Sequence, residues 1–130
     1  MTKVNDIKKK VQDNRENIIQ FLRDIVAIPS MESQLKEVGE RVGAEMTKLG
    51  FEEVRFDKMG NIMGRIGSGR RVIVYDSHID TVGVGDPASW KWDPFKGKVE
   101  NGIFYARGTC DEKGSTPGMV YGLSFAKEMG

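Results

Sequence analysis

The most informative part of the sequence is residues 71–82, Arg-Val-Ile-Val-Tyr-Asp-Ser-His-Ile-Asp-Thr-Val. Its first residue, Arg71, is followed by a run of four β-branched or aromatic residues, 72–75. A continuous apolar run of this length is typical of a strand buried on both faces of a sheet. Polar residues follow the run directly, and ligands bind at the carboxyl ends of strands in open α/β sheets. The sequence therefore predicts a central strand that leads into a functional site.

The polar end of this stretch holds His78, the only histidine of the chain, and Asp80. In extended backbone, the side chains of residues two apart point to the same side. An imidazole beside a carboxylate is typical of a metal site, where the carboxylate fixes the tautomer of the ligating histidine. A structural hydrogen bond between the two side chains is the simpler interpretation, and this pair alone does not exclude it.

Length, charge and cysteine content narrow the class of protein. The 130 residues suffice for one domain with a real core. A net charge of +1 without a basic block argues against a nucleic-acid partner. A single cysteine excludes an internal disulfide and a multi-cysteine zinc finger, and it fits a reducing compartment. Because no signal-peptide or membrane-length apolar segment is visible, we expect a cytoplasmic protein with no membrane partner.

Apolar periodicity predicts two amino-terminal helices that serve packing, the first over residues 5–28 and the second over 35–49. Ser30 or Ser33 is expected to cap the second helix at its start. Gly50 is expected in the left-handed conformation just past its end.

The rest of the chain alternates between short strands, turns and one further helix. Short strands are predicted near 51–56 and 61–66, and an Asn-Gly pair predicts a hairpin over 98–105. The last predicted helix, about 117–129, has proline in its first turn and is rich in apolar and small residues, so we expect it to be buried.

Two tryptophans, Trp90 and Trp92, lie in a long loop over residues 83–95. They could contact a substrate near the predicted site. The favoured interpretation is that they anchor the loop to the body of the domain.

A second polar cluster, Asp111, Glu112 and Lys113, stands just before the last helix. Acidic residues near a helix amino terminus have a purely structural explanation, because the helix dipole favours negative charge there. Together with His78 and Asp80, however, they suggest a carboxylate- and imidazole-lined metal site of the kind that zinc accepts.

The sequences of two motifs, residues 77–82 and 107–114, resemble those of a zinc metallopeptidase family. That family includes aminoacylases, acetylornithine deacetylase, succinyl-diaminopimelate desuccinylase, dipeptidases and glutamate carboxypeptidases. Within it, the motif sequences most resemble those of the branch of selenium-metabolism hydrolases. The resemblance covers nearly the whole chain. It implies an α/β fold: the amino-terminal part of a mixed-sheet, three-layer catalytic domain, with two amino-terminal helices followed by strands and a buried helix.

The resemblance also implies roles for individual residues. His78 would be a terminal ligand of one metal ion, Asp80 a catalytic residue that orients its imidazole, and Asp111 a bridge between two ions. The ions would be zinc, with cobalt or manganese as alternatives, and the peptide bond between Asp111 and Glu112 would be cis. The implied reaction is hydrolysis of amide bonds in N-acyl amino acids or small peptides, for which bound ions activate water and polarise the carbonyl.

The family's general base, its remaining ligands and its lid domain have no counterpart in residues 1–130. We therefore expect a partial metallohydrolase domain that is inactive alone, binds at most one metal ion weakly and associates with itself through exposed core surface. A non-catalytic binding module that keeps part of the fold is the alternative. A cysteine hydrolase using Cys110 and His78 is disfavoured, because neighbouring carboxylates oppose the thiolate that it needs.

Overall fold

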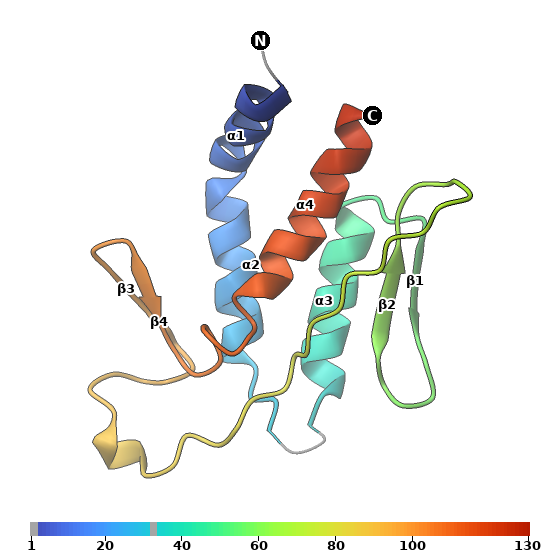
Figure 1. Cartoon of the computed structure of the whole chain (residues 1–130). Coiled ribbons are helices and arrows are strands. Elements are labelled where there is room, and N and C mark those ends of the chain that lie inside the picture. Colours follow the sequence, from blue (N-terminus) through green and yellow to red (C-terminus); the bar gives the residue numbers. More distant parts are fainter. Residues whose placement is uncertain (1–2, 32–33) are drawn as a thin grey trace.

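The computed structural model of the chain describes residues 3–31 and 34–130. The fold is α/β, as predicted, and its sheets are two separate antiparallel pairs within the described residues. In chain order the elements are α1 (Lys3–Asp13), α2 (Arg15–Ala27), α3 (Lys36–Lys48), β1 (Glu53–Phe56), β2 (Ile62–Arg65), the 3-10 turn η1 (Pro87–Ser89), β3 (Lys98–Glu100), β4 (Ile103–Tyr105) and α4 (Ser115–Met129). Figure 1 shows β1–β2 and β3–β4 on opposite sides of the helices.

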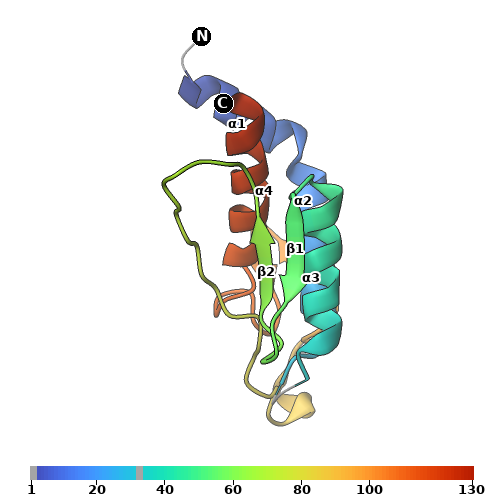
Figure 2. The ribbon, with the colours of Figure 1, turned by 90° about the vertical axis from the view of Figure 1, so that its right-hand side faces the viewer.

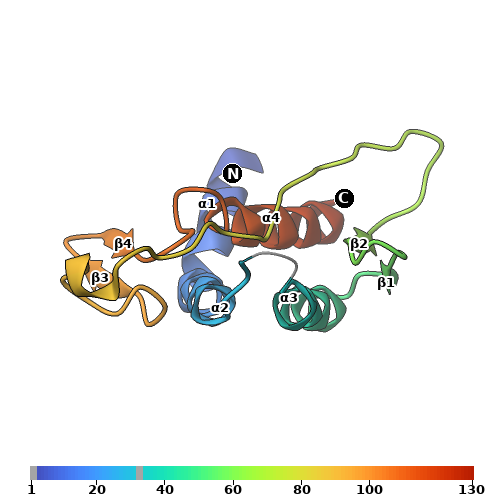
Figure 3. The same cartoon turned by 90° about the horizontal axis from the view of Figure 1, so that it is seen from below.

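The core lies between three helices. Helices α2 and α3 lie side by side, and α4 crosses the same face of both (Figure 3). Each helix contributes apolar residues spaced three or four apart, which places them on one face. The buried core residues are Phe21, Ile25, Val38, Val42, Phe51, Val120, Tyr121 and Phe125.

A buried carboxylate ties the three helices together. The Glu45 side chain of α3 is 2% exposed and accepts a 2.6 Å hydrogen bond from the Tyr121 hydroxyl of α4. It also pairs with Arg41 at 2.8 Å and Lys48 at 3.1 Å, and Arg41 reaches Asp24 of α2 at 2.8 Å. Burial alone would raise the pKa of Glu45, but these hydrogen bonds and charges outweigh it and hold the pKa below its usual value.

The β1–β2 hairpin packs against the outer side of α3 (Figure 2). The approach is close because α3 carries two glycines four residues apart. A Cβ on Gly39 would lie 3.0 Å from the Phe56 ring, and one on Gly43 would lie 3.2 Å from Ile62 Cδ1. Phe56 and Ile62 are direct cross-strand partners, and the two strands predicted near 51–56 and 61–66 are confirmed.

The single helix predicted over 5–28 is wrong, because the backbone departs from helical geometry at Asn14 and the segment forms α1 and α2. Helix α1 buries no residue, and its apolar side chains Val4, Ile7 and Val11 are about half exposed. The packing role predicted for this face is therefore absent from the described structure.

Of the capping predictions for the second helix, the one at its carboxyl end is confirmed and the one for Ser30 at its amino end is wrong. Gly50 takes the left-handed conformation after α3, with φ of +77°, as predicted. Ser30 is not a helix cap, because its hydroxyl donates to the Ile79 carbonyl instead. Ser33 lies outside the described residues.

The prediction of a buried central strand over 72–75 is wrong. These residues form no strand, and Val72, Ile73 and Val74 are 80%, 78% and 81% exposed. A strand buried in a sheet needs hydrogen-bonded neighbours, whereas the strands within 3–31 and 34–130 pair only as β1 with β2 and β3 with β4. Figure 2 shows the chain after β2 swinging away from the helices before it returns to them.

The predicted last helix corresponds to α4, which begins two residues earlier than expected. It is buried on one face only, because Gly118, Gly122 and Ala126 are exposed. No helix in the described part of the chain combines the length and apolar character that crossing a membrane requires.

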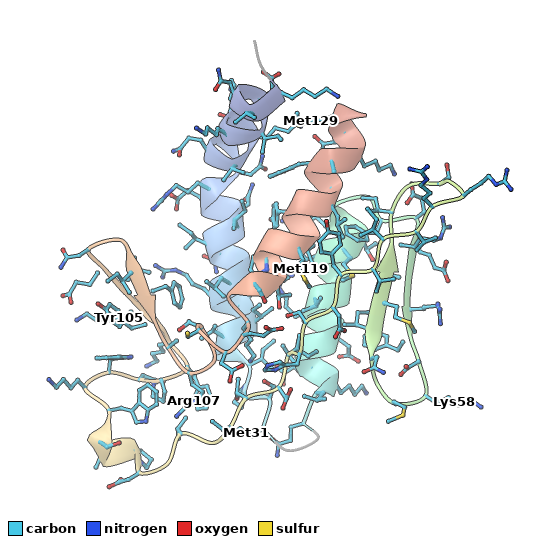
Figure 4. The ribbon with its side chains drawn as sticks, viewed as in Figure 1. Met31, Lys58, Tyr105, Arg107, Met119 and Met129 are labelled. Atoms are coloured by element: carbon cyan, nitrogen blue, oxygen red, sulfur yellow. The ribbon has the colours of Figure 1, made fainter. Side chains whose placement is uncertain are left out.

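The predicted hairpin is confirmed as β3–β4, and the two tryptophans fasten the preceding loop to it. Trp90 donates its indole N–H to the Val84 carbonyl at 2.8 Å. The Trp92 ring meets Trp90 and Tyr105 edge-on, with centroids 6.2 Å and 5.4 Å away. Figure 4 labels Tyr105 on β4, the strand to which the loop is fastened. This packing is the anchoring role favoured from the sequence.

Candidate functional site

The segment that carries His78, residues 77–81, is fixed to the chain just after α2. The Thr81 N–H donates to the Ser30 carbonyl at 3.0 Å, and the Ser30 hydroxyl donates to the Ile79 carbonyl at 2.8 Å. Ser30 is fully buried, so both bonds are shielded from water. They hold the backbone on the carboxyl side of His78 against the body of the domain.

The segment that carries Asp111 is a tight loop, residues 108–115, which follows β4 and runs into the first residue of α4. The Lys113 N–H donates to the Gly108 carbonyl at 2.8 Å, and the Ser115 N–H donates to the Glu112 carbonyl at 2.9 Å. The peptide bond between Asp111 and Glu112 is cis, which confirms the expectation from the family resemblance.

The structure brings the three predicted site residues together. His78 Nε2 lies 2.9 Å from Asp111 Oδ1, and His78 Nδ1 lies 3.1 Å from Asp80 Oδ1. The His78 backbone N–H also donates to Glu112 Oε1 at 3.0 Å. The imidazole is thus held between two carboxylates from separate segments, and a third carboxylate holds its backbone.

The electrostatics of this cluster favour a cation. Partial burial lowers the pKa of His78, but the hydrogen bond to Asp111 and the Asp80 contacts outweigh burial and raise it above its ordinary value. The same two carboxylates would stabilise a metal ion at this place, because they provide negative charge whichever cation is bound.

The cluster lies at the wall of a hollow of about 320 Å³. The hollow is lined by His78, Asp80, Thr81, Val82, Ala106, Arg107, Gly108, Cys110 and Asp111. Arg107, labelled in Figure 4, brings a positive charge to this lining. Cys110 is exposed and makes no hydrogen bond to His78 in the described structure, so the geometry gives no support to a cysteine–histidine pair.

The donor set fits part of a metal site. Asp80 holds Nδ1 and leaves Nε2 facing the Asp111 carboxylate, which is the arrangement of a metal-ligating histidine with its supporting carboxylate. No group of three or more His, Cys, Asp or Glu side chains that could hold a metal ion occurs among residues 3–31 and 34–130. Since zinc usually takes four ligands, His78 and Asp111 would supply at most half of those that a zinc site needs.

Lys113 lies beside the site, and its burial and hydrogen bonds were not predicted from the sequence. Its side chain is 1% exposed, and Nζ donates to the Ile25 carbonyl at 2.8 Å and the Ile28 carbonyl at 2.9 Å. Burial lowers the pKa of Lys113 to about 8, so it remains an ammonium at neutral pH. A lysine within a polar run is typical of a solvated surface, and no local pattern signals this burial.

Comparison with known proteins identifies relatives of this chain. Residues 74–130, which contain His78, Asp80 and Asp111, match peptidase family M20/M25/M40. The uncharacterized protein YgeY of Escherichia coli (strain K12) is 42% identical over 124 residues, which cover 95% of this chain and 31% of that protein. This finding and the family match confirm the family resemblance inferred from the two motifs.

Two relatives carry a functional name. The succinyl-diaminopimelate desuccinylases of Afipia carboxidovorans and Beijerinckia indica are 34% and 33% identical to this chain. The matches cover 75% and 77% of this chain but 27% and 28% of those proteins. The chain thus spans less than a third of the length of these curated relatives.

Proposed function

We propose that this chain, homologous to peptidase family M20/M25/M40 over residues 74–130, is the amino-terminal part of a metal-dependent hydrolase. Its substrates would be N-acyl amino acids or small peptides, cleaved at the amide bond. The observation that carries the proposal is the placement of His78 Nε2 against Asp111 with Nδ1 held by Asp80. The two relatives named as desuccinylases, enzymes that remove an acyl group, support the choice of substrate class.

Each site residue has a distinct task in this proposal. His78 and Asp111 would hold a divalent metal ion, for which we propose zinc, and Asp111 would have a second oxygen for another ion. Asp80, which lies 3.1 Å from Nδ1, would keep the proton of the imidazole on Nδ1 and so leave Nε2 available as a metal ligand. A bound ion in such a site supplies polarisation of the amide carbonyl and acidification of water.

We further propose that this chain is inactive alone. The described residues hold two of the donors that a zinc site needs, and the chain spans 31% of YgeY. The general base and the other ligands would belong to the part of the relatives that the chain does not cover. A cytoplasmic location is part of the proposal, because a reducing compartment suits the free thiol of Cys110.

Titration with zinc, followed by calorimetry, tests the half-site. We expect the chain to bind one Zn²⁺ weakly, and His78→Ala and Asp111→Ala to abolish the heat of binding. Asp80→Asn should weaken binding about 10- to 100-fold, because a partner that orients a ligand typically contributes that much. Cys110→Ser is the matched control, since Cys110 lines the same hollow and should leave zinc affinity unchanged.

A folded wild-type chain that binds no zinc would overturn the half-site and favour the non-catalytic binding module. Loss of binding in Cys110→Ser would mean that the thiol is a ligand, and the assigned donor pair would then be wrong. Circular dichroism of every variant separates loss of a ligand from loss of the fold.

As a second proposal, the chain associates with itself through the exposed run 72–75. This proposal holds equally if the chain is a non-catalytic binding module. The run is apolar and exposed, and it makes no ladder hydrogen bonds to the described strands. If two copies paired antiparallel with Ile73 opposite Val74, Arg71 of one copy would face Asp76 of the other. Opposite charges at both ends would then fix the register of the pair.

A further inference from the structure

We propose that Lys113 is a positioning residue for the candidate metal centre, which it serves by fastening loop 108–115 to the carboxyl end of α2. The metal-binding consequence rests on the proposed function above. The fastening itself is independent of that function and is tested separately.

The side chain of Lys113 spans the gap between the loop and the helix end. Its ammonium donates to the carbonyls of Ile25 and Ile28, at 2.8 Å and 2.9 Å. Carbonyls at the end of a helix lack intrahelical partners, and the negative end of the helix dipole favours a cation there. Two otherwise orphaned acceptors and a buried charge thus satisfy one another.

The main chain and stem of Lys113 fix the rest of the loop. Its N–H closes the loop by donating to the Gly108 carbonyl at 2.8 Å. The stem runs over Gly108, where a Cβ would lie 3.5 Å from Lys113 Cδ and 2.5 Å from Thr81 Cγ2. Loop 108–115 is therefore seated on both α2 and the segment 77–81, which Ser30 ties to the end of the same helix.

This seating decides where the Asp111 carboxylate lies. The Asp111 side chain is 86% exposed, so almost nothing packs against it and its position depends on the backbone beneath. Glu112, immediately before Lys113, accepts from the His78 N–H. Without the Lys113 ammonium, the loop loses its bonds to α2, and both contacts with His78 lose their support.

The test replaces Lys113 with methionine, which keeps an unbranched stem of similar length but removes the ammonium donors. Native-state hydrogen exchange is measured for the His78 and Lys113 amides, and for the core amides of α3. We expect Lys113→Met to speed exchange at the two site amides at least about tenfold more than in the core. Tyr121→Phe is the matched control, because it removes one buried hydrogen bond away from the loop and should not single out the site amides.

A second readout follows the metal centre itself, with Co²⁺ titrated and detected by visible absorption. Lys113→Met should weaken cobalt binding about tenfold or more, while Tyr121→Phe leaves it unchanged. If the methionine variant does not fold, Lys113→Gln, which retains an amide N–H donor, carries the same comparison with a smaller expected effect.

Equal acceleration of site and core amides in Lys113→Met would overturn the proposal and reduce Lys113 to a general stabilising residue. Unchanged cobalt affinity in a variant with a loosened loop would overturn its link to the metal centre. A wild-type chain that binds no cobalt would refute the proposed metal function, whereas the exchange comparison alone would decide whether Lys113 fastens the loop.

Discussion

Gly108 lies so close to Thr81 that a Cβ on Gly108 would sit 2.5 Å from Thr81 Cγ2. Gly108 begins the loop that carries Asp111, and Thr81 ends the segment that carries His78. Their contact therefore sets how closely the two halves of the candidate site approach. The backbone of Gly108 is left-handed, with φ of +84°, a conformation that glycine adopts more readily than other residues.

Alanine at Gly108 should both strain the backbone and push the two site segments apart. We expect Gly108→Ala to lower the free energy of unfolding by about 3 kcal/mol, combining the strain of a left-handed residue with overpacking. Urea denaturation measures this. Gly60→Ala is the matched control, because Gly60 has φ of +89° and a Cβ there would meet nothing within 4 Å, so it should lose only about 1 kcal/mol. Equal losses of unfolding free energy in the two variants would show that the clash of the added methyl group with Thr81 does not destabilise the protein.

The buried carboxylate of Glu45 predicts a specific acid sensitivity. Its pKa is lower in the folded protein than its ordinary value of 4.5, so Glu45 adds stability above pH 4.5 and loses it as the pH falls through the folded value. Thermal unfolding of wild type and Glu45→Gln should therefore differ most near neutral pH, and the difference should shrink steadily below pH 4.5. A difference that grows on acidification would contradict the sign of this shift.

Tyr121 allows the same network to be tested from the opposite helix. Tyr121→Phe removes the hydroxyl that donates to Glu45, and we expect it to lower the free energy of unfolding by about 2 kcal/mol, as for a hydrogen bond to a charged group. The control is Tyr105→Phe, whose hydroxyl has no hydrogen bond in the described structure, and it should unfold like wild type. A similar loss in both variants would mean that the bond to Glu45 is not what stabilises the helices.

Features encoded by neighbouring residues could be predicted from the sequence. The spacing of apolar residues over 35–49 predicted α3, and an Asn-Gly pair predicted the β3–β4 hairpin. His78, Asp80 and Asp111 were singled out because their motifs carry chemistry in a recognisable order, and the structure brings the three side chains together. The short range of these signals explains the success, since each depends on little beyond its own segment.

Features that depend on distant partners could not be predicted. The environment of Lys113 is set by the carbonyls of Ile25 and Ile28, far away in the sequence, so the residues next to Lys113 do not indicate its burial. Whether the run 72–75 becomes a strand depends on neighbours to pair with, and apolar composition alone does not supply them. The strand propensity of residues 72–75 therefore identified a segment capable of pairing, but it did not show whether the segment is paired in the structure.

The hydroxyl of Ser30 should matter to the site more than an equally buried serine elsewhere. Ser30→Ala removes the bond to the Ile79 carbonyl, and we expect a loss of about 1 kcal/mol in unfolding free energy together with faster exchange of the Thr81 amide. Ser124→Ala, which removes the bond to the Leu49 carbonyl, is the matched control and should leave the Thr81 amide unaffected. If both variants speed Thr81 equally, Ser30 stabilises the fold in general and does not hold the segment 77–81 in particular.

The exposed run 72–75 should make the chain associate as its concentration rises. Burying the apolar side chains of the run, which are 58% to 81% exposed, and giving their backbone a ladder partner both favour pairing of two copies. Sedimentation velocity should show dimer increasing with concentration, and Ile73→Lys should remove it. Val4→Lys, on the exposed face of α1, controls for the added charge and should leave the dimer unchanged.

The register of this pairing is testable by charge reversal. With Ile73 opposite Val74, Arg71 faces Asp76 of the other copy, so Arg71→Asp should weaken the dimer and addition of Asp76→Arg should restore it. The exchanged pair should be as salt-sensitive as the original one, because both are exposed ion pairs. Failure of the double variant to recover, with dimer still present in wild type, would exclude this antiparallel register and require another surface for association.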